Sequence, residues 1–163
     1  MSFSFDLLAG SDSVAIMGII NLSPDSFYSK SCSSNADDAI NIAEKLINEG
    51  AHILDLGAES TRPGSTKVSV DLQLKRLLPV VSKLSRICEI PISVDTYNPE
   101  IASAVLQEGA NVINDVSGLK WGDEMARIVA EYKAGLVLMH MQGTPETMQI
   151  NPHYNDVVAD VIS

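Results

Sequence analysis

The sequence predicts an α/β protein: a TIM-type (β/α)8 barrel, truncated after about five βα units. Two observations support this fold class. Short runs of β-branched and aliphatic residues recur without the strict polar alternation of a sheet that has one solvent face, which predicts strands buried on both sides. Between them lie amphipathic segments that are long enough to cross back over a parallel sheet.

The two kinds of segment alternate along the whole chain. The strands are expected at residues 14–20, 52–57, 91–95, 111–115 and 135–140. The crossover helices are expected at residues 36–49, 70–85, 99–108 and 124–133, and a fifth begins near Asn155. The pattern is therefore a series of consecutive βα units.

Residues at the helix ends support these boundaries. Asn98 is expected to be an N-cap, with Pro99 at the first helical position. A left-handed residue often ends a helix, and glycine adopts that conformation at the lowest cost. Three glycines lie between a helical segment and a strand and are expected in this role: Gly50, Gly109 and Gly135.

Two architectures fit a parallel alternation: an open doubly wound sheet and a closed barrel. A dinucleotide-binding sheet usually has a G-x-G-x-x-G turn after its first strand, whereas this strand runs into Asn21-Leu-Ser-Pro-Asp-Ser-Phe27. The barrel is therefore favoured. Eight units need about 250 residues, so residues 1–163 are expected to form one incomplete domain, the N-terminal part of a longer barrel protein.

Composition excludes several classes of partner. The net charge of −10 and the absence of a Lys and Arg cluster argue against nucleic acid and anionic membrane surfaces. The N-terminus lacks a basic leader, and the apolar run at residues 14–20 is too short to span a bilayer. Cys32 and Cys88 are expected to be reduced thiols. We therefore expect a soluble, cytoplasmic protein.

Polar residues follow the predicted strands at the edge where ligands bind in both architectures. Such groups suit a polar heterocycle, which they would hold by directional hydrogen bonds. The strand tips carry Asn21, Asp55, Asp95, Asn114, Asp115 and His140, and the loops beyond them carry Ser23, Asp25, Thr61, Arg62 and Gln142.

Two aspartates at these tips have different expected roles. Asp95 could accept two parallel hydrogen bonds from an edge like that of a 2-aminopyrimidinone, with Asn114 satisfying neighbouring groups. The alternative is that Asp95 caps the third helix or a turn. Asp55 either contacts the ligand or organises the loop that begins at Glu59.

Other tip and loop residues also have expected roles, some of them with an alternative. Thr61 and Arg62 form a plausible anion clamp, or Arg62 makes a surface ion pair in a solvated turn. Asn21 could give one oxygen to a Mg²⁺ ion otherwise held by water and phosphate. Val116 and Met139 would form an apolar slot for a flat ring or pack the barrel, and we expect His140 to be a core or supporting imidazole.

Five stretches together resemble the amino-terminal part of the dihydropteroate synthase family, over a match that runs from about residue 14 to the end. These stretches are Met17-Gly-Ile-Ile-Asn-Leu-Ser-Pro-Asp-Ser-Phe27, Asp55-Leu-Gly-Ala-Glu-Ser-Thr-Arg-Pro-Gly64, Ser93-Val-Asp-Thr96, Ile113-Asn-Asp115 and Leu138-Met-His-Met-Gln-Gly143. The resemblance implies a transferase of folate biosynthesis. It joins 6-hydroxymethyl-7,8-dihydropterin pyrophosphate to p-aminobenzoate and releases pyrophosphate with the assistance of Mg²⁺.

The resemblance also implies roles for single residues. Asp95 and Asn114 would hold the pterin, and Val116 and Met139 would line its slot. Thr61 and Arg62 would engage the pyrophosphate and help to frame the p-aminobenzoate pocket, with Asp95 and Arg62 the catalytic groups and Asn21 serving the metal.

The family also uses an aspartate near the fifth helix, a lysine in the seventh unit and an Arg-x-His pair after the eighth strand, and these regions are not in this sequence. We therefore expect negligible synthase turnover from the 163 residues alone, which a steady-state assay of the purified chain would check. The alternatives are a related pterin-fold methyltetrahydrofolate methyltransferase domain and a non-catalytic half-barrel assembly module. Open strand edges also predict a homo-oligomer.

Overall fold

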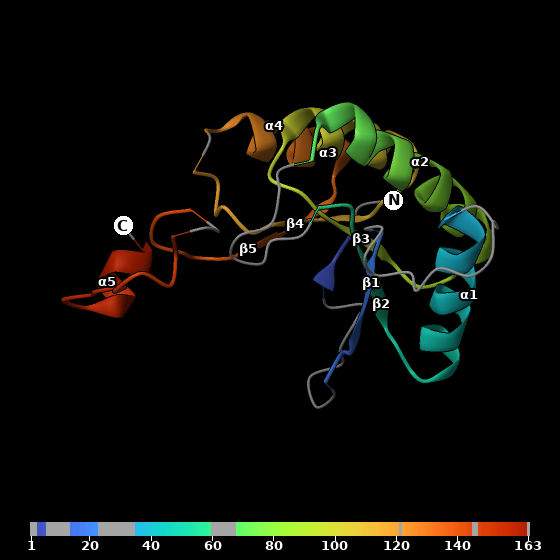
Figure 1. Cartoon of the computed structure of the whole chain (residues 1–163), viewed down its shortest axis with the longest axis horizontal. Coiled ribbons are helices and arrows are strands. Elements are labelled where there is room, and N and C mark those ends of the chain that lie inside the picture. The colour runs from blue at the N-terminus through green and yellow to red at the C-terminus, as the bar shows by residue number, and fades with distance from the viewer. Residues whose placement is uncertain are drawn as a thin grey trace.

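The chain folds into parallel strands that alternate with helices (Figure 1). The computed structural model describes residues 3–5, 14–22, 35–59, 68–120, 122–144 and 147–162. In chain order the elements are β1 (Met17–Asn21), α1 (Asn35–Asn48), β2 (Ile53–Gly57), α2 (Val70–Ile87), β3 (Ile92–Asp95), α3 (Pro99–Gln107), β4 (Val112–Asp115), α4 (Glu124–Tyr132), β5 (Gly135–Leu138) and α5 (Val157–Ile162).

The order of the strands decides between the two candidate architectures. All five form one parallel sheet in the order β1-β2-β3-β4-β5. A doubly wound sheet reverses its order at a switch point, whereas a barrel adds each strand beside the previous one. Figure 1 shows helices α1 to α4 in an arc along one side of the sheet, and successive helices contact each other. The predicted barrel-type fold is therefore confirmed.

Burial of the strands follows their position in the sheet. All five residues of β2 are buried, as expected for a strand that is covered on both faces. In β1, by contrast, Gly18 and Ile20 are buried and Met17 and Ile19 are exposed. Gly18 faces Leu46 of α1, so the exposed residues lie on the opposite face. Burial on both sides was therefore wrong for β1.

Two strand boundaries differ from the expected ones by more than one residue, because partner strands set them. The first strand begins at Met17 rather than residue 14, since its partner β2 begins opposite, at Ile53. Strand β5 ends at Leu138 rather than residue 140, opposite Asp115, where β4 also ends. An apolar run therefore predicted the strands but overestimated their paired length.

The structure confirms most of the expected helix ends. The Asn98 side chain caps α3 by accepting hydrogen bonds from the backbone N–H groups of Glu100 and Ile101, and Pro99 is the first helical residue. Gly50 and Gly109 have positive φ angles of 100° and 110°, as their expected role requires.

Gly135 does not have the expected left-handed role. Lys133 ends α4 in that conformation, with φ of 55°, and Gly135 is the first residue of β5. A Cβ atom on Gly135 would lie 2.6 Å from Cδ1 of Phe3, whose backbone N–H donates to the carbonyl of Lys133. The packing of the N-terminal segment, and not backbone conformation, therefore requires glycine at this position.

The sheet edges, the membrane prediction and the cysteines can each be compared with the structure. Strands β1 and β5 each pair with one strand of the described sheet, and association through these edges stays a prediction. Among the described residues, no helix has the length and apolarity needed to cross a membrane, and the cytoplasmic location stays a prediction. Cys88 is a free thiol as expected, and Cys32 lies outside the described residues.

The Asn98 cap has a measurable energy. Asn98→Ala removes the acceptor of two α3 N–H groups and is expected to lower the free energy of unfolding by about 1 kcal/mol. Chemical denaturation checks this value, and Asn98→Asp, which keeps the acceptor, is expected to stay close to wild type. Equal stability of wild type and Asn98→Ala would contradict the capping role.

Candidate functional site

Four strand tips lie in one row at the carboxyl edge of the sheet. In the strand register, Asn21 is opposite Gly57, Gly57 is opposite Asp95 and Asp95 is opposite Asn114. Residues in one register row of a parallel sheet point to the same face. A Cβ atom on Gly57 would lie 3.4 Å from Oδ1 of Asn21 and 3.9 Å from Oδ2 of Asp95. The structure thus brings together three predicted site residues.

Asp55 lies beneath this row, deeper in the sheet, and contacts one of its members. It is opposite Ser93 in the register, two residues deeper in the sheet, and is only 5% exposed. Its Oδ2 accepts a hydrogen bond of 3.2 Å from Nδ2 of Asn114, two strands away. Asp55 therefore orients the side-chain amide of Asn114, and the oxygen of that amide accepts no hydrogen bond from the described residues.

The Asp95 carboxyl group is strongly perturbed. Its pKa is raised from 3.8 to about 7 by burial and by the negative charges of Asp55, Glu59 and Asp115. The group therefore changes charge near neutral pH. The alternative role of Asp95 as a helix cap is excluded, because Asn98 caps α3.

Asp115 follows Asn114 but has a structural task. Its Oδ1 accepts from the N–H of Ser117 at 2.8 Å and its Oδ2 from that of Leu119 at 2.9 Å. These bonds shape the turn after β4, in which Val116 is buried. Although its charge acts on Asp95, the hydrogen bonds of Asp115 satisfy the backbone.

Residues beyond β5 are more exposed than predicted. Met139 is 38% exposed, and its N–H donates to the carbonyl of Asp115. Met139 therefore lies beside the turn that holds Val116, while the slot predicted from these two residues stays a prediction. His140 is exposed and packs against Tyr154 with ring centroids 5.6 Å apart. His140 is therefore not a core residue, because β5 ends before it, and its supporting role stays a prediction.

Gln142 links two parts of the C-terminal segment. Its side chain donates to the carbonyl of His153 at 2.6 Å and accepts from the N–H of the same residue at 2.9 Å. Four predicted residues lie outside the described residues: Ser23, Asp25, Thr61 and Arg62.

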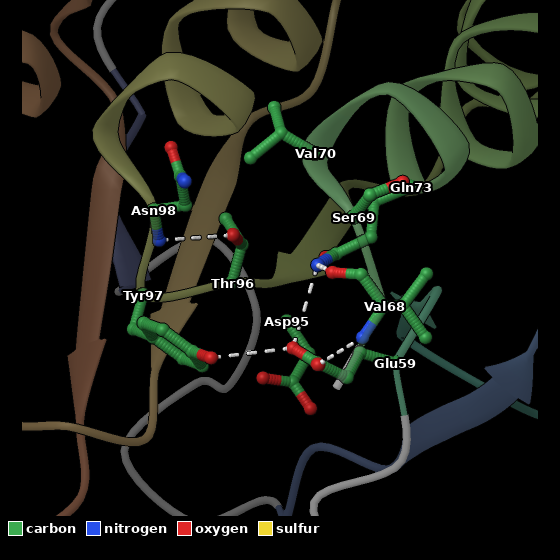
Figure 2. Close-up of a pocket in the computed structure, with 9 residues that line it drawn as sticks. All are labelled: Glu59, Val68, Ser69, Val70, Gln73, Asp95, Thr96, Tyr97 and Asn98. Carbon is green, nitrogen blue, oxygen red and sulfur yellow. Dashed lines mark hydrogen bonds between the residues drawn. The ribbon is translucent and has the colours of Figure 1, made fainter. Parts of the chain in front are cut away.

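A cavity of about 390 Å³ opens beside Asp95, between the end of β2, the start of α2 and the connection after β3 (Figure 2). Its wall contains Glu59, which the sequence reasoning treated only as part of a motif. Oε1 of Glu59 accepts from the N–H of Val68 at 2.8 Å, and Oε2 accepts from Gln73 and Tyr97, each at 3.4 Å. An acidic residue two positions after a strand was a signal, but its partners are distant in sequence.

Comparisons with known proteins show the family to which the chain belongs. Residues 17–163 match the family described as pterin binding enzyme. The dihydropteroate synthase of Escherichia coli strain K12 is 45% identical over 148 residues, which are 90% of this chain and 51% of that protein. The dihydropteroate synthase of Bacillus subtilis strain 168 is 39% identical, over 96% of this chain and 52% of that protein.

Solved structures give the same result. The Xanthomonas albilineans dihydropteroate synthase with 4-aminobenzoic acid is 41% identical, with a TM-score of 0.80 over 91% of this chain and 52% of that one. The Burkholderia cenocepacia enzyme complexed with 7,8-dihydropteroate is also 41% identical, with a TM-score of 0.76 over 92% of this chain and 50% of that one.

This chain spans about half the length of the relatives that it matches. Its similarity to them includes all five strands of the sheet, because the family match begins at the first residue of β1. The chain therefore belongs to the family of pterin-binding enzymes.

Proposed function

We propose that this chain supplies the pterin-binding part of a dihydropteroate synthase. The whole enzyme would condense 6-hydroxymethyl-7,8-dihydropterin pyrophosphate with p-aminobenzoate to give 7,8-dihydropteroate and pyrophosphate. The observation that carries the proposal is the row of polar strand tips with Asp95 at its centre. Relatives named as dihydropteroate synthases support the reaction class.

The pterin ring would bind between β3 and β4. An ionised Asp95 would accept two hydrogen bonds from the aminopyrimidinone edge, and the free amide oxygen of Asn114 would accept a third. Burial strengthens such bonds, because the surrounding dielectric is low. Val116 and Met139 would supply the apolar walls of the ring slot.

The pyrophosphate and its metal would lie toward β1 and β2. No group of three or more His, Cys, Asp or Glu side chains that could hold a metal occurs among the described residues. The oxygens of Asn21 and Asp95 nevertheless border the space above Gly57, and oxygen donors are the ligands that Mg²⁺ prefers. We infer that Asn21 would contribute one ligand, and that Thr61 and Arg62 would bind the pyrophosphate oxygens. When bound, Mg²⁺ would neutralise charge on the leaving pyrophosphate.

The proposed reaction proceeds by displacement of pyrophosphate. The bond between the pterin methylene carbon and the pyrophosphate oxygen breaks first or nearly so, and the oxygen takes the electron pair. The Asp95 carboxylate stabilises the resulting methylene cation. The neutral amine of p-aminobenzoate then forms the new C–N bond, and the resulting ammonium gives its proton to water, which leaves dihydropteroate.

Removal of the Asp95 charge is expected to affect ligand binding and stability in opposite directions. Asp95→Asn should lower the affinity of the chain for 6-hydroxymethyl-7,8-dihydropterin at least tenfold at pH 8, measured by calorimetry. In wild type, affinity should rise as the pH passes through about 7, the pKa of Asp95. This ligand has no pyrophosphate, so titration of phosphate does not disturb the profile.

The stability effect follows from the sign of the same shift. Because the folded state raises the Asp95 pKa, its contribution to stability is present below 3.8 and is lost as the pH rises to about 7. Ligand-free Asp95→Asn should therefore be more stable than wild type at pH 8. Asp123→Asn is the matched control, since the Asp123 side chain makes no capping bond. Unchanged pterin affinity in Asp95→Asn would contradict the assigned role.

The bond between Asp55 and Asn114 gives a separate prediction. Asp55→Asn leaves a side chain that can donate as well as accept, so the Asn114 amide is no longer held in one orientation. At pH 8 Asp95 is largely ionised in both proteins, although Asp55→Asn also removes one of the charges that raise the Asp95 pKa, so pterin affinity should fall there about fivefold to tenfold, the cost of roughly one hydrogen bond. Ser93→Ala is the control, because the equally buried Ser93 hydroxyl has no hydrogen-bond partner among the described residues. Equal affinities for wild type and Asp55→Asn would show that the orientation of Asn114 is unimportant.

A further inference from the structure

Glu59 connects three segments that meet at the cavity beside Asp95. It lies two residues after the end of β2, and its carboxylate accepts hydrogen bonds from Val68, just before α2, and from Gln73 in the first turns of α2. It also accepts from the hydroxyl of Tyr97 in the connection after β3. Figure 2 shows these bonds converging on Glu59 in the cavity wall. One side chain therefore holds together most of the described rim.

The contacts around Glu59 are reinforced from α2. Gln73 donates to Oε2 of Glu59 and, at 3.0 Å, to the carbonyl of Val68. It therefore contacts both partners of the hydrogen bond between Val68 and Glu59, which we call the Glu59–Val68 bridge. Arg76 donates to the carbonyl of Ala58 at 2.8 Å. Gln73 is buried, although most glutamine side chains are exposed. The N-terminal turn of α2 is thus joined to the end of β2 by side chains.

Glu59 also acts on its neighbours through its charge. It is one of the three negative groups that raise the pKa of Asp95, together with Asp55 from β2 and Asp115 from β4. The pKa of the Tyr97 hydroxyl is raised as well, first by burial and then by the charge and the hydrogen bond of Glu59. The Figure 2 view places the Asp95 carboxylate next to that of Glu59.

We propose that Glu59 is a positioning residue of the pterin site: its bonds to Val68, Gln73 and Tyr97 set the rim of the cavity, and its charge acts on Asp95. The part of this proposal that concerns pterin rests on the proposed function. Glu59 itself need not touch the ligand. Its negative charge helps to keep the pKa of the Asp95 carboxyl group near neutral pH.

The charge effect can be measured without any ligand. The test compares the Asp95 pKa, read from the carboxyl carbon shift by NMR titration, in wild type, Glu59→Gln and Glu131→Gln. Loss of a negative neighbour favours ionisation, so the Asp95 pKa should fall in Glu59→Gln. It should stay at the wild-type value in Glu131→Gln, which removes an exposed charge on α4. An unchanged Asp95 pKa in Glu59→Gln would overturn the proposal.

The geometric effect has its own readout. Hydrogen exchange at the Val68 amide, which donates to Glu59, should be faster in Gln73→Leu, a variant that removes one bridge donor and no charge. Denaturation of each variant checks that it is folded. If Glu59→Gln does not fold, Gln73→Leu still tests whether the Glu59–Val68 bridge holds the rim. An exchange rate at the Val68 amide of Gln73→Leu equal to that of wild type would contradict this role.

Pterin affinity then separates this inference from the proposed function. In Glu59→Gln the pH midpoint of 6-hydroxymethyl-7,8-dihydropterin binding should shift below that of wild type, because Asp95 ionises earlier. A merely structural Glu59 would lower affinity at every pH without moving the midpoint, and that result would count against the proposal. If wild type binds no pterin at any pH, the proposed function fails. The Asp95 titration and the Val68 exchange would still decide the role of Glu59.

Discussion

The site depends on the parallel register that places Asn21, Gly57, Asp95 and Asn114 in one row. Each strand contributes one tip, and the sequential order of the strands keeps neighbouring tips adjacent in space. Because the side-chain period of a strand is two, a slip of one residue would turn a tip to the helix-covered face. The glycine within the row leaves open the space that the oxygens of Asn21 and Asp95 border.

The same register concentrates negative charge around Asp95. Asp55 comes from β2, Glu59 from the segment just after β2 and Asp115 from β4, while Asp95 itself is half-buried. Ionising Asp95 in this place costs folding free energy that an exposed aspartate would not lose. A ligand that carries hydrogen-bond donors and develops positive charge would relieve this cost. The electrostatics therefore favour a cationic or proton-donating ring over an anion at β3 and β4.

Much of the fold was predictable because it depends on local patterns. Apolar runs and amphipathic periodicity predicted the strands and the crossover helices, and the sequence Asn98-Pro99 predicted a helix start that the structure confirms. The errors arose where another segment decides the local structure. Pairing with β2 sets the start of β1, and Phe3 requires the small residue at position 135.

The candidate site was predictable in part for a similar reason. The ends of parallel strands converge, so the grouping of Asn21, Asp95 and Asn114 follows from topology and is confirmed. The partners of Glu59 could not be predicted, because Tyr97 lies 38 residues away and only the folded chain brings it near. The exposure of His140 was missed because the length of β5 depends on where β4 ends.

A structure of the chain with bound 6-hydroxymethyl-7,8-dihydropterin would test directly whether Asp95 and Asn114 hold the pterin ring. We expect the aminopyrimidinone edge to lie within hydrogen-bonding distance of the Asp95 carboxylate and the ring to contact the amide oxygen of Asn114. A ring bound elsewhere on the chain, with Asp95 and Asn114 uncontacted, would contradict it.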